Sequence, residues 1–585
     1  MQRAMWLGFL TLNTLACGGA AATKQYAPLS APLQLPSRES LTELSARPVP
    51  VVTQPVKAQG VDRWTFEGEG LGDADVAPPA PVVSALADAG PTPTPALHCV
   101  AEQVARFYLA HAASPSPRVL SYMSARCGTA HVEALRTMMT RFDSAPEGSV
   151  EDIAAALPPD TWSALGPVFG DAPRAMRAGA WLQRGDDGTV ALAVVSAPTG
   201  VSVRALPIED DVVTVAGRLA LEDVTEVMGV VNRGPHGWAE CTSKGAAADF
   251  TLRCPIDAGD ASAWIDVVVA VKGQLLGRTV ARVLAHREGA GAITYPTQVE
   301  RRPVSDPEAF RREVLARLNA RRATAGLRPL RLAAAQSAQM DPLAPHYFAG
   351  DAEGDAAVLD RITLGVMAGW DVKGGLITNA DVLATHLPGS RDAVGWLTET
   401  LERPTGRRAL LAPQATQVAL GAAVDAPRPG LSSLVATYTF LDDADVGAEA
   451  AEFVTRLNDA RAAAGRAPVQ VRSDPMPELD EAAARVREGT HPGLALDEAL
   501  AAAVARRTIS MGGMYLVTAR MEDAEFSEEL ITAADLNTWV RVAHVAIGES
   551  RWGFRVVLVA TTRGPGSART AQRGPHEGPG VAVGL

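Results

Sequence analysis

The spacing of apolar residues predicts where helices and strands alternate in the first half of the chain. Residues 100–112 carry apolar side chains at i, i+4, i+7 and i+8, which predicts an amphipathic helix. A second apolar helix is predicted at about 131–142. The turn at 185–188 and the apolar run after it then predict a pair of strands. We therefore expect an α+β module over residues 98–198.

The pattern changes to short β-branched runs over residues 199–290. Runs such as VSVRAL, DFTLRCPI and WIDVVVAV are separated by Gly, Asp or Asn turns and show no helical period. Several strands at this close spacing predict an antiparallel β-sandwich. No catalytic motif falls in this range, so we expect a spacer or an adhesive unit.

Clear helix signals return at 305–326. Ser305 and Glu308 form a capping-box pattern, Pro307 fits the first turn, and Gly326 follows the last turn. The apolar stripe of this helix predicts its buried face. Its residues are Phe310, Val314, Leu315 and Leu318.

The end of this helix is repeated later in the chain. Residues 317–330 read RLNARRATAGLRPL, and residues 456–469 read RLNDARAAAGRAPV. Eight of these fourteen positions are identical, and the two segments lie 139 residues apart. We infer an internal duplication from this match.

The first seventeen residues form a secretory signal. Arg3 precedes an apolar run from Met5 to Leu15, which is too short to span a bilayer of about 30 Å. The sequence Ala-Cys-Gly that follows resembles the end of a bacterial lipoprotein signal, although Thr14 and Leu15 depart from the usual residues. The alternative is an ordinary signal peptide. The resemblance implies lipidation of Cys17 and a lipid-anchored protein of the bacterial cell envelope, at the outer membrane or cell surface.

Two segments have compositions typical of disorder. Residues 18–97 hold twelve of the 41 prolines among Ala, Ser, Thr and Gly, and we expect them to form a disordered tether. Within it, VDRWTF at 61–66 is a candidate docking strand. Residues 564–585 are rich in Gly and Pro, and we expect a disordered tail.

Four cysteines remain once Cys17 is set aside, an even number in an exported chain, which favours two disulfides. Three pairings are possible, and we favour the local one because each pair then lies inside one predicted unit. A zinc site is the alternative, but neither CxxC nor HxxxH spacing occurs, so we predict no metal. The favoured pairs are Cys99–Cys127 and Cys241–Cys254.

Composition excludes some partners. The chain has 54 Lys and Arg against 66 Asp and Glu, a formal net charge of -12, which disfavours binding to the phosphates of nucleic acids. Aromatic residues make up only 5%, too few for base-stacking surfaces. GxSxG, HExxH, phosphate-loop and dinucleotide-binding motifs are all missing from the sequence. We therefore expect no nucleic acid partner, no cofactor and no enzyme activity.

The repeated segment carries a resemblance to a family. LNxxRxxxGLxPL resembles the first helix of bacterial CAP domains, also called the SCP or cysteine-rich secretory protein superfamily. Three later segments resemble that family's loop, Trp helix and closing strand. They are 369–381, 396–424 and 433–440.

The resemblance implies an α-β-α sandwich around an antiparallel sheet. The resemblance covers residues 300–442 well and 446–563 loosely. Whether residues 98–198 are a third, more diverged copy is left open at this point. The fold class that we expect is multidomain α/β plus β: an N-terminal α+β module, a β-sandwich and two tandem CAP-like sandwiches.

The family is discussed around a cleft of two His and two Glu that can hold a divalent metal. By resemblance, His346 takes the first His position, Asn379 survives from the Gly-Glu-Asn loop, and Glu399 matches the second Glu. Arg407 stands at the second His position, where a guanidinium donates only and cannot ligate a cation. For Arg407 we expect a salt bridge with Glu399, and the alternatives are an anion site or no role.

These features favour a binding or scaffold protein for an unknown extracellular protein, glycan or lipid ligand. Two alternatives stay open. One is an exported hydrolase that uses a CAP-type cleft, which needs His346 and Glu399 close together. The other is a carrier of a small lipid or sterol, which needs a large apolar groove.

Overall fold

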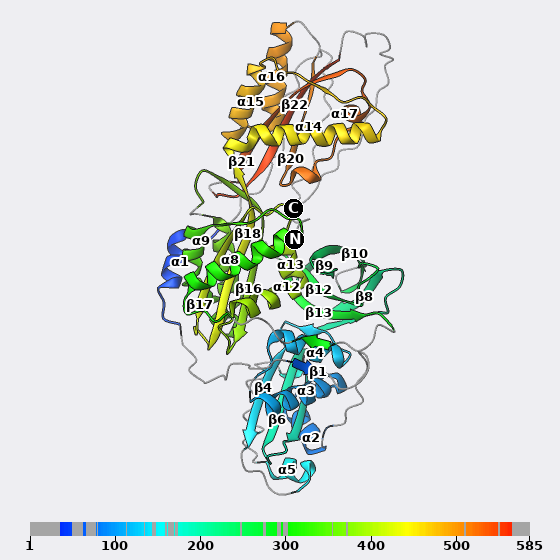
Figure 1. Ribbon diagram of the computed structural model, residues 1–585, viewed down its shortest axis with the longest axis vertical. Coiled ribbons are helices and arrows are strands. Elements are labelled where there is room, and N and C mark those ends of the chain that lie inside the picture. Colours follow the sequence, from blue (N-terminus) through cyan, green and yellow to red (C-terminus); the bar gives the residue numbers. More distant parts are fainter. Residues whose placement is uncertain are drawn as a thin grey trace.

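The computed structural model describes residues 35–49, 63–65 and most of 80–563, with several short gaps and a longer one over most of 158–172. Cys17 and the predicted tail at 564–585 lie outside the described residues. The described strands form one eight-stranded sheet, three four-stranded sheets and one two-stranded sheet. Figure 1 shows the three four-stranded sheets, with their helices, following one another along the long axis of the molecule, and the eight-stranded sheet beside the middle one.

The N-terminal unit is a four-stranded sheet with helices on both faces. Its strand order is β2-β5-β6-β4, with β2 parallel to β5 and the other pairs antiparallel. Val82 and Ile153 pack on one face of the sheet, while Val100 and Phe107 pack on the other. Its elements are α2 (Ala80–Ala89), β2 (Thr92–Pro93), α3 (Pro95–His111), α4 (Pro117–Arg126), β4 (Arg136–Phe142), α5 (Val150–Ala156), β5 (Met176–Arg184) and β6 (Val190–Pro198).

The helix predicted at 131–142 is wrong. These residues form β3 (His131–Val132) and β4, and every residue of β4 has a partner on β6. The segment can be read with either period because Ala, Leu and Met are good helix formers. Pairing with a buried neighbouring strand overrides that local preference.

The next unit is built from one antiparallel sheet of eight strands. The order is β3-β13-β12-β9-β10-β11-β8-β7, and β7 also lies against β13, so the sheet curls into a near-barrel. The first half of β10 pairs with β9 and the second half with β11. The remaining strands are β7 (Val201–Ala205), β8 (Val212–Leu219), β9 (Val224–Arg233), β10 (Gly237–Gly245), β11 (Asp249–Pro255), β12 (Ser262–Val271) and β13 (Arg278–His286).

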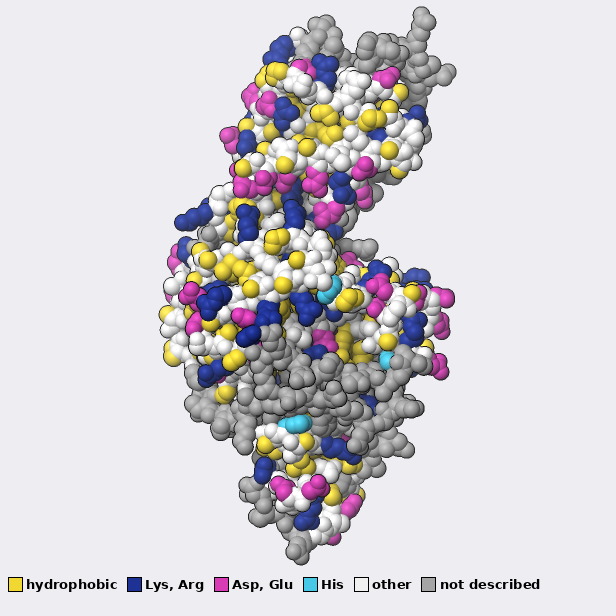
Figure 2. Space-filling model, in the orientation of Figure 1, with side chains coloured by type: hydrophobic (Ala, Val, Ile, Leu, Met, Phe, Trp, Pro, Cys, Tyr) yellow, Lys and Arg dark blue, Asp and Glu magenta, His cyan; other side chains and the backbone are white. Residues whose placement is uncertain are grey.

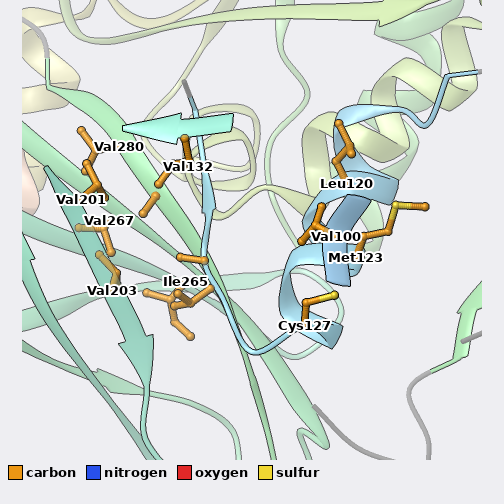
Figure 3. Close-up of a cluster of buried hydrophobic side chains, with 14 of the residues drawn as sticks. Val100, Leu120, Met123, Cys127, Val132, Val201, Val203, Ile265, Val267 and Val280 are labelled. Atoms are coloured by element: carbon orange, nitrogen blue, oxygen red, sulfur yellow. The ribbon is translucent and has the colours of Figure 1, made fainter. Parts of the chain in front are cut away.

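The predicted strands are confirmed, but the arrangement of two separate sheets is corrected to one continuous sheet. The interior of this near-barrel joins the core of the N-terminal unit. Figure 3 shows Val100 and Met123 on helices, and Val132, Ile265 and Val267 on strands, all within one cluster of buried side chains.

The middle unit is a three-layer α-β-α sandwich with strand order β15-β17-β18-β16. Successive residues of β17 face opposite layers: Val418 and Leu420 contact the core that holds Trp396, whereas Ala419 contacts the core that holds Ile362. Its elements are α8 (Pro307–Thr324), β15 (Arg331–Leu332), α9 (Ala334–Met340), α10 (Leu343–Glu353), α11 (Ala356–Ala368), β16 (Gly375–Pro388), α12 (Ala393–Glu402), α13 (Pro404–Leu410), β17 (Gln417–Val424) and β18 (Gly430–Asp442).

The cap of α8 differs from the predicted one. Asp306, not Ser305, is the N-cap, and its side chain accepts a hydrogen bond from the Ala309 amide. The Ser305 hydroxyl donates to the Asp306 carboxylate instead. Gly326 follows the helix with φ of 71°, as the sequence predicted.

The C-terminal unit repeats this sandwich with strand order β19-β21-β22-β20. Phe453 and Val540 lie in the core on one face, and Leu479 and Ala543 lie in the core on the other. Its elements are α14 (Val446–Ala463), β19 (Gln470–Val471), α15 (Pro477–Arg487), α16 (Pro492–Arg507), β20 (Gly512–Thr518), α17 (Glu528–Thr532), β21 (Leu536–Ala546) and β22 (Gly553–Arg563).

All three four-stranded sheets have the same topology. In each unit the first strand is parallel to the third, the third and fourth form a hairpin, and the second lies at the opposite edge. In each unit a helix also precedes the first strand, two or three helices follow it, and at least one helix precedes the third strand. Residues 80–198 thus have the topology of the two later units.

The segment 18–97 is not wholly a tether. It contains α1 (Arg38–Ser45), whose Leu41 and Leu44 are buried against the middle unit. It also contains β1 (Arg63–Thr65), the docking strand that VDRWTF predicted, which pairs with β14 (Thr294–Pro296). Among the described helices, none is long and apolar enough to cross a membrane.

Both predicted disulfides are confirmed. Cys99 in α3 is bonded to Cys127 at the end of α4, 28 residues away. Cys241 on β10 is bonded to Cys254 on β11, so that this bond joins adjacent strands of the near-barrel.

Candidate functional site

Arg407, at the second His position of the predicted cleft, contacts the near-barrel. It projects from α13, and its Nη1 donates to the carbonyl oxygens of Gly234 at 2.9 Å and Gly237 at 3.2 Å. Its Nε donates to the Leu401 carbonyl oxygen at 3.0 Å. Burial lowers the pKa of Arg407 to about 10, which leaves it charged at neutral pH. The side chain is therefore a clamp on the turn between β9 and β10.

Glu399 is buried on α12 and pairs with a different arginine. Its exposed fraction is 4%, and its Oε1 lies 3.3 Å from Nη2 of Arg403, one turn along the chain. The predicted salt bridge between Glu399 and Arg407 is wrong. Arg407 lies on α13 and donates to the near-barrel. Arg403 lies between α12 and α13, one turn after Glu399, and is therefore the arginine within reach of that carboxylate.

A small pocket lies beside Glu399. Its volume is about 10 Å³, roughly the room that one water molecule needs. Three arginines and two glutamates line it, so it is polar rather than apolar. The lining residues are Arg118, Ser121, Trp264, Arg282, Glu399, Glu402 and Arg403.

Asn379 interrupts β16 and binds the C-terminal unit. Its φ of 50° lies in the left-handed region, and the pairing of β16 with β18 shifts register between Thr378 and Asp381. Asn tolerates this conformation better than most residues. Its amide nitrogen donates to the Ala519 carbonyl oxygen at 2.9 Å, 140 residues further along the chain.

His346 lies on α10, far along the chain from the other three. It is 8% exposed, and burial lowers its pKa. A hydrogen bond with the backbone of Ser45, at the end of α1, acts in the opposite direction. This histidine therefore contacts the N-terminal segment that covers the middle unit.

The four residues predicted to line a cleft do not contact one another through hydrogen bonds or ion pairs in the described part of the chain. Over that same part of the chain, no three His, Cys, Asp or Glu side chains are arranged to hold a metal ion. Three of the four residues instead contact another unit or α1.

Sequence reasoning missed the centre of the first junction, which is Asp266. This carboxylate is fully buried on β12. It accepts from Arg282 at 2.7 Å, and from both the amide and the hydroxyl of Thr405 on α13, at 3.0 and 2.7 Å. A lone acid inside the apolar run WIDVVVAV was the available signal, because a buried charge needs a partner.

The α12–α13 turn also contacts the N-terminal unit. The Tyr122 hydroxyl of α4 donates to Oε1 of Glu402 at 2.9 Å, and Arg118 pairs with the same carboxylate. From the near-barrel, the Asn232 amide donates to the Glu402 carbonyl oxygen at 2.6 Å. Three units thus meet at one helical turn.

A second junction joins the middle and C-terminal units through a shared core. Trp552 is fully buried, its indole nitrogen donates to the Met367 carbonyl oxygen, and its backbone bridges to Ile377. Met367 and Ile377 of the middle unit belong to the same hydrophobic cluster as Trp539 and Leu479. The two repeats are therefore packed together.

An ionic network lies in the C-terminal unit beside this junction. His544 on β21 lies 2.7 Å from the Glu449 carboxylate and 3.2 Å from Asp443, the residue that begins the connection between the two repeats. Arg555 also binds Glu449, and donates to the Ala519 carbonyl oxygen that Asn379 contacts. His544 is therefore a buried strand histidine whose two ring nitrogens each contact a carboxylate.

Comparison with known proteins gives little. No protein-family model and no curated protein matches the chain. The structure is similar to the crystal structure of a cysteine-rich secretory protein from Staphylococcus aureus, with a TM-score of 0.18 and 11% identity. That similarity covers 41% of this chain and 85% of the other. At these values the fold of this chain rests on the topology described above.

Proposed function

We propose that the protein is an exported, non-catalytic scaffold of the bacterial cell envelope, anchored by a lipid on Cys17 and built from CAP-like units. Such a scaffold presents binding surfaces for an extracellular protein, glycan or lipid. The two disulfides support export, because such bonds persist outside the reducing cytosol.

The observation that carries the non-catalytic part is the use of the cleft positions. Asn379 donates to Ala519 of the next unit, and Arg407 donates to Gly234 and Gly237 of the near-barrel. Donors of both side chains are bound to backbone carbonyl oxygens of other units, which supports a structural role for these two positions. Contacts that hold units together thus replace the chemistry of a cleft.

The CAP-like identity of the repeats is supported by their topology and motif. The RLN motif starts at Arg317 and Arg456 in equivalent helices, and each helix covers the same face of the same type of sheet. The N-terminal unit shares the topology without the motif. We infer that it is a third, diverged copy.

The catalytic alternative has a direct test. Purified protein is assayed for hydrolysis of peptide, polysaccharide and ester substrates, alongside the variants His346→Ala and Glu399→Gln. The proposal predicts no turnover that depends on either residue. Turnover that both substitutions abolish, with folding preserved by circular dichroism, would identify an enzyme.

The anchor has a separate test. Cells that express the protein are labelled with radioactive palmitate, and the Cys17→Ser variant is the control. The proposal predicts label in the native chain only, and release of the variant from the membrane fraction. Equal membrane partition of both proteins contradicts the anchor.

A further inference from the structure

The equivalent helices α8 and α14 differ in their exposed charged residues. Figure 1 shows both helices crossing the same side of the molecule, each in front of its own sheet. Four arginines on α8, the loop after it and the start of β15 are exposed, and none forms an ion pair or a side-chain hydrogen bond in the described part of the chain. We call them the basic face: Arg312, Arg321, Arg328 and Arg331.

The internal repeat shows that these arginines are not needed for the fold. At the four equivalent positions, 139 residues later, the C-terminal unit has Ala451, Ala460, Ala467 and Gln470. The buried arginine is kept in both units as Arg322 and Arg461, as is the preceding asparagine of the motif. The fold therefore retains the structural residues and changes the exposed ones.

The C-terminal unit carries acids on the corresponding side. Glu452 on α14 is exposed, and α17 and the 3-10 turn before it pack against α14. Phe453 of α14 contacts Phe526, which fixes this acidic segment next to the helix. We call the exposed acids the acidic face: Glu452, Glu522, Glu525 and Glu528.

The helices α8 and α14, from which the two faces are defined, lie on the same side of the molecule (Figure 1). Figure 2 shows Lys and Arg side chains gathered over the middle unit, and Asp and Glu side chains along the nearer edge of the C-terminal unit. A two-fold axis that lies in the plane of this side and crosses the long axis of the molecule turns two copies face to face and places the middle unit of each opposite the C-terminal unit of the other. Two copies placed face to face and antiparallel would therefore pair each basic face with the partner's acidic face, twice.

We propose that this side of the molecule is a self-association surface, where a second copy of the chain binds face to face through the basic and acidic faces. Charge complementarity steers such association and fixes its orientation. Because the charges are exposed, salt weakens the dimer. The proposal does not depend on whether the cleft is catalytic or whether Cys17 carries a lipid.

The test is sedimentation velocity of the purified full-length chain at low and at high salt. We expect a concentration-dependent dimer at low salt that dissociates at high salt. The repeat supplies the first variant, which combines Arg312→Ala, Arg321→Ala, Arg328→Ala and Arg331→Gln, because the fold accepts these residues at the equivalent positions of the C-terminal unit. This variant should weaken dimerisation at least about tenfold.

Charge reversal gives the decisive control. In one variant all four arginines of the basic face are changed, as Arg312→Glu, Arg321→Glu, Arg328→Glu and Arg331→Glu. In the other all four acids of the acidic face are changed, as Glu452→Lys, Glu522→Lys, Glu525→Lys and Glu528→Lys. Each alone should be monomeric, and an equimolar mixture should form a one-to-one dimer, because both contacts are then complementary again.

Two results would overturn the proposal. The first is a native chain that stays monomeric at low salt at every concentration, even if it binds vesicles with anionic headgroups through the basic face. The second is a mixture of the two reversed variants that does not associate although each is folded by circular dichroism.

Discussion

Arg322 and Arg461, which lie 139 residues apart, make the same contacts in two different units. The Nε of Arg322 donates to the Arg328 carbonyl oxygen, and the Nε of Arg461 donates to the Ala467 carbonyl oxygen, each six residues ahead and each at 2.7 Å. The guanidinium of each then reaches three further carbonyl oxygens. These are Leu410, Ala412 and Ala415 in one unit, and Leu530, Ile531 and Ala533 in the other.

Each arginine therefore connects the first helix to the loop that leads into the third strand. Substitution of Arg461 by Met would remove the donor from four carbonyl oxygens, of which one is buried and three are partly buried. We expect a loss of about 3 kcal/mol or more in the unfolding free energy of the C-terminal unit, since an unsatisfied buried polar group costs about 1–3 kcal/mol. Urea unfolding followed by tryptophan fluorescence measures this loss.

Arg466 provides the matched control, because it is exposed on the loop after the same helix. The Arg466→Met variant should unfold within about 0.5 kcal/mol of the native protein. Equal stability of the Arg461 and Arg466 variants would show that the hydrogen bonds of the Arg461 guanidinium do not stabilise the unit.

Asp266 holds the near-barrel to the middle unit. In Asp266→Ala, the largely buried Arg282 loses its ion-pair partner, and the amide of Thr405 loses its hydrogen-bond acceptor. Breaking a buried pair costs about 3–5 kcal/mol, so we expect a lower melting temperature and faster proteolysis at the α12–α13 turn. The exposed Asp249, whose side chain is 79% accessible, gives the control Asp249→Ala, which should melt like the native protein.

His386 makes stability depend on pH. Burial, with a smaller contribution from Arg428, lowers its pKa to about 4, below the ordinary value of 6.5. The unfolded chain therefore binds a proton more readily than the folded chain, so stability falls as pH decreases from about 6.5 to about 4. The stabilisation that comes from His386 is fully present above about pH 6.5.

The variant His386→Asn keeps a polar group opposite Ser432, which contacts the His386 ring nitrogen at 3.0 Å. It should show a flatter stability profile between pH 6.5 and 4, measured by urea unfolding at each pH. A profile as steep as that of the native protein would assign the pH dependence to other groups.

The two disulfides should stabilise the fold by different amounts. In the loop-entropy model, the bond between Cys99 and Cys127 closes the longer loop and stabilises by about 3–4 kcal/mol, and the bond between Cys241 and Cys254 by about 3 kcal/mol. Thermal unfolding of the paired Ser variants, one pair at a time, measures both. Peptide mass spectrometry without reduction should recover these two pairs and no others.

The sequence predicted the features that local chemistry determines. The strands of the near-barrel, the end of α8 at Gly326 and both disulfides follow from turn residues, helix signals and cysteine spacing. The helix predicted at 131–142 failed because pairing with β6, some fifty residues away, decides its conformation. The tether prediction failed at Leu41, because burial on the middle unit depends on a surface elsewhere in the chain.

The candidate site was predicted by position but not by contact. The family resemblance assigned Asn379 and Arg407 to a cleft. Their partners are backbone carbonyls of Ala519 and Gly234. A backbone carbonyl acceptor leaves no pattern in the sequence, because every residue has one. The contacts between units could therefore be found only from the structure.

Hydrogen exchange at the turn between β9 and β10 tests most directly whether a cleft position serves as a clamp. The native protein is compared with Arg407→Ala, and with Arg331→Ala as an exposed control. Loss of the clamp on Gly234 and Gly237 should speed amide exchange at residues 233–238 several-fold in Arg407→Ala alone. Unchanged exchange in that variant would contradict the account, because Arg407 would then not hold the units together.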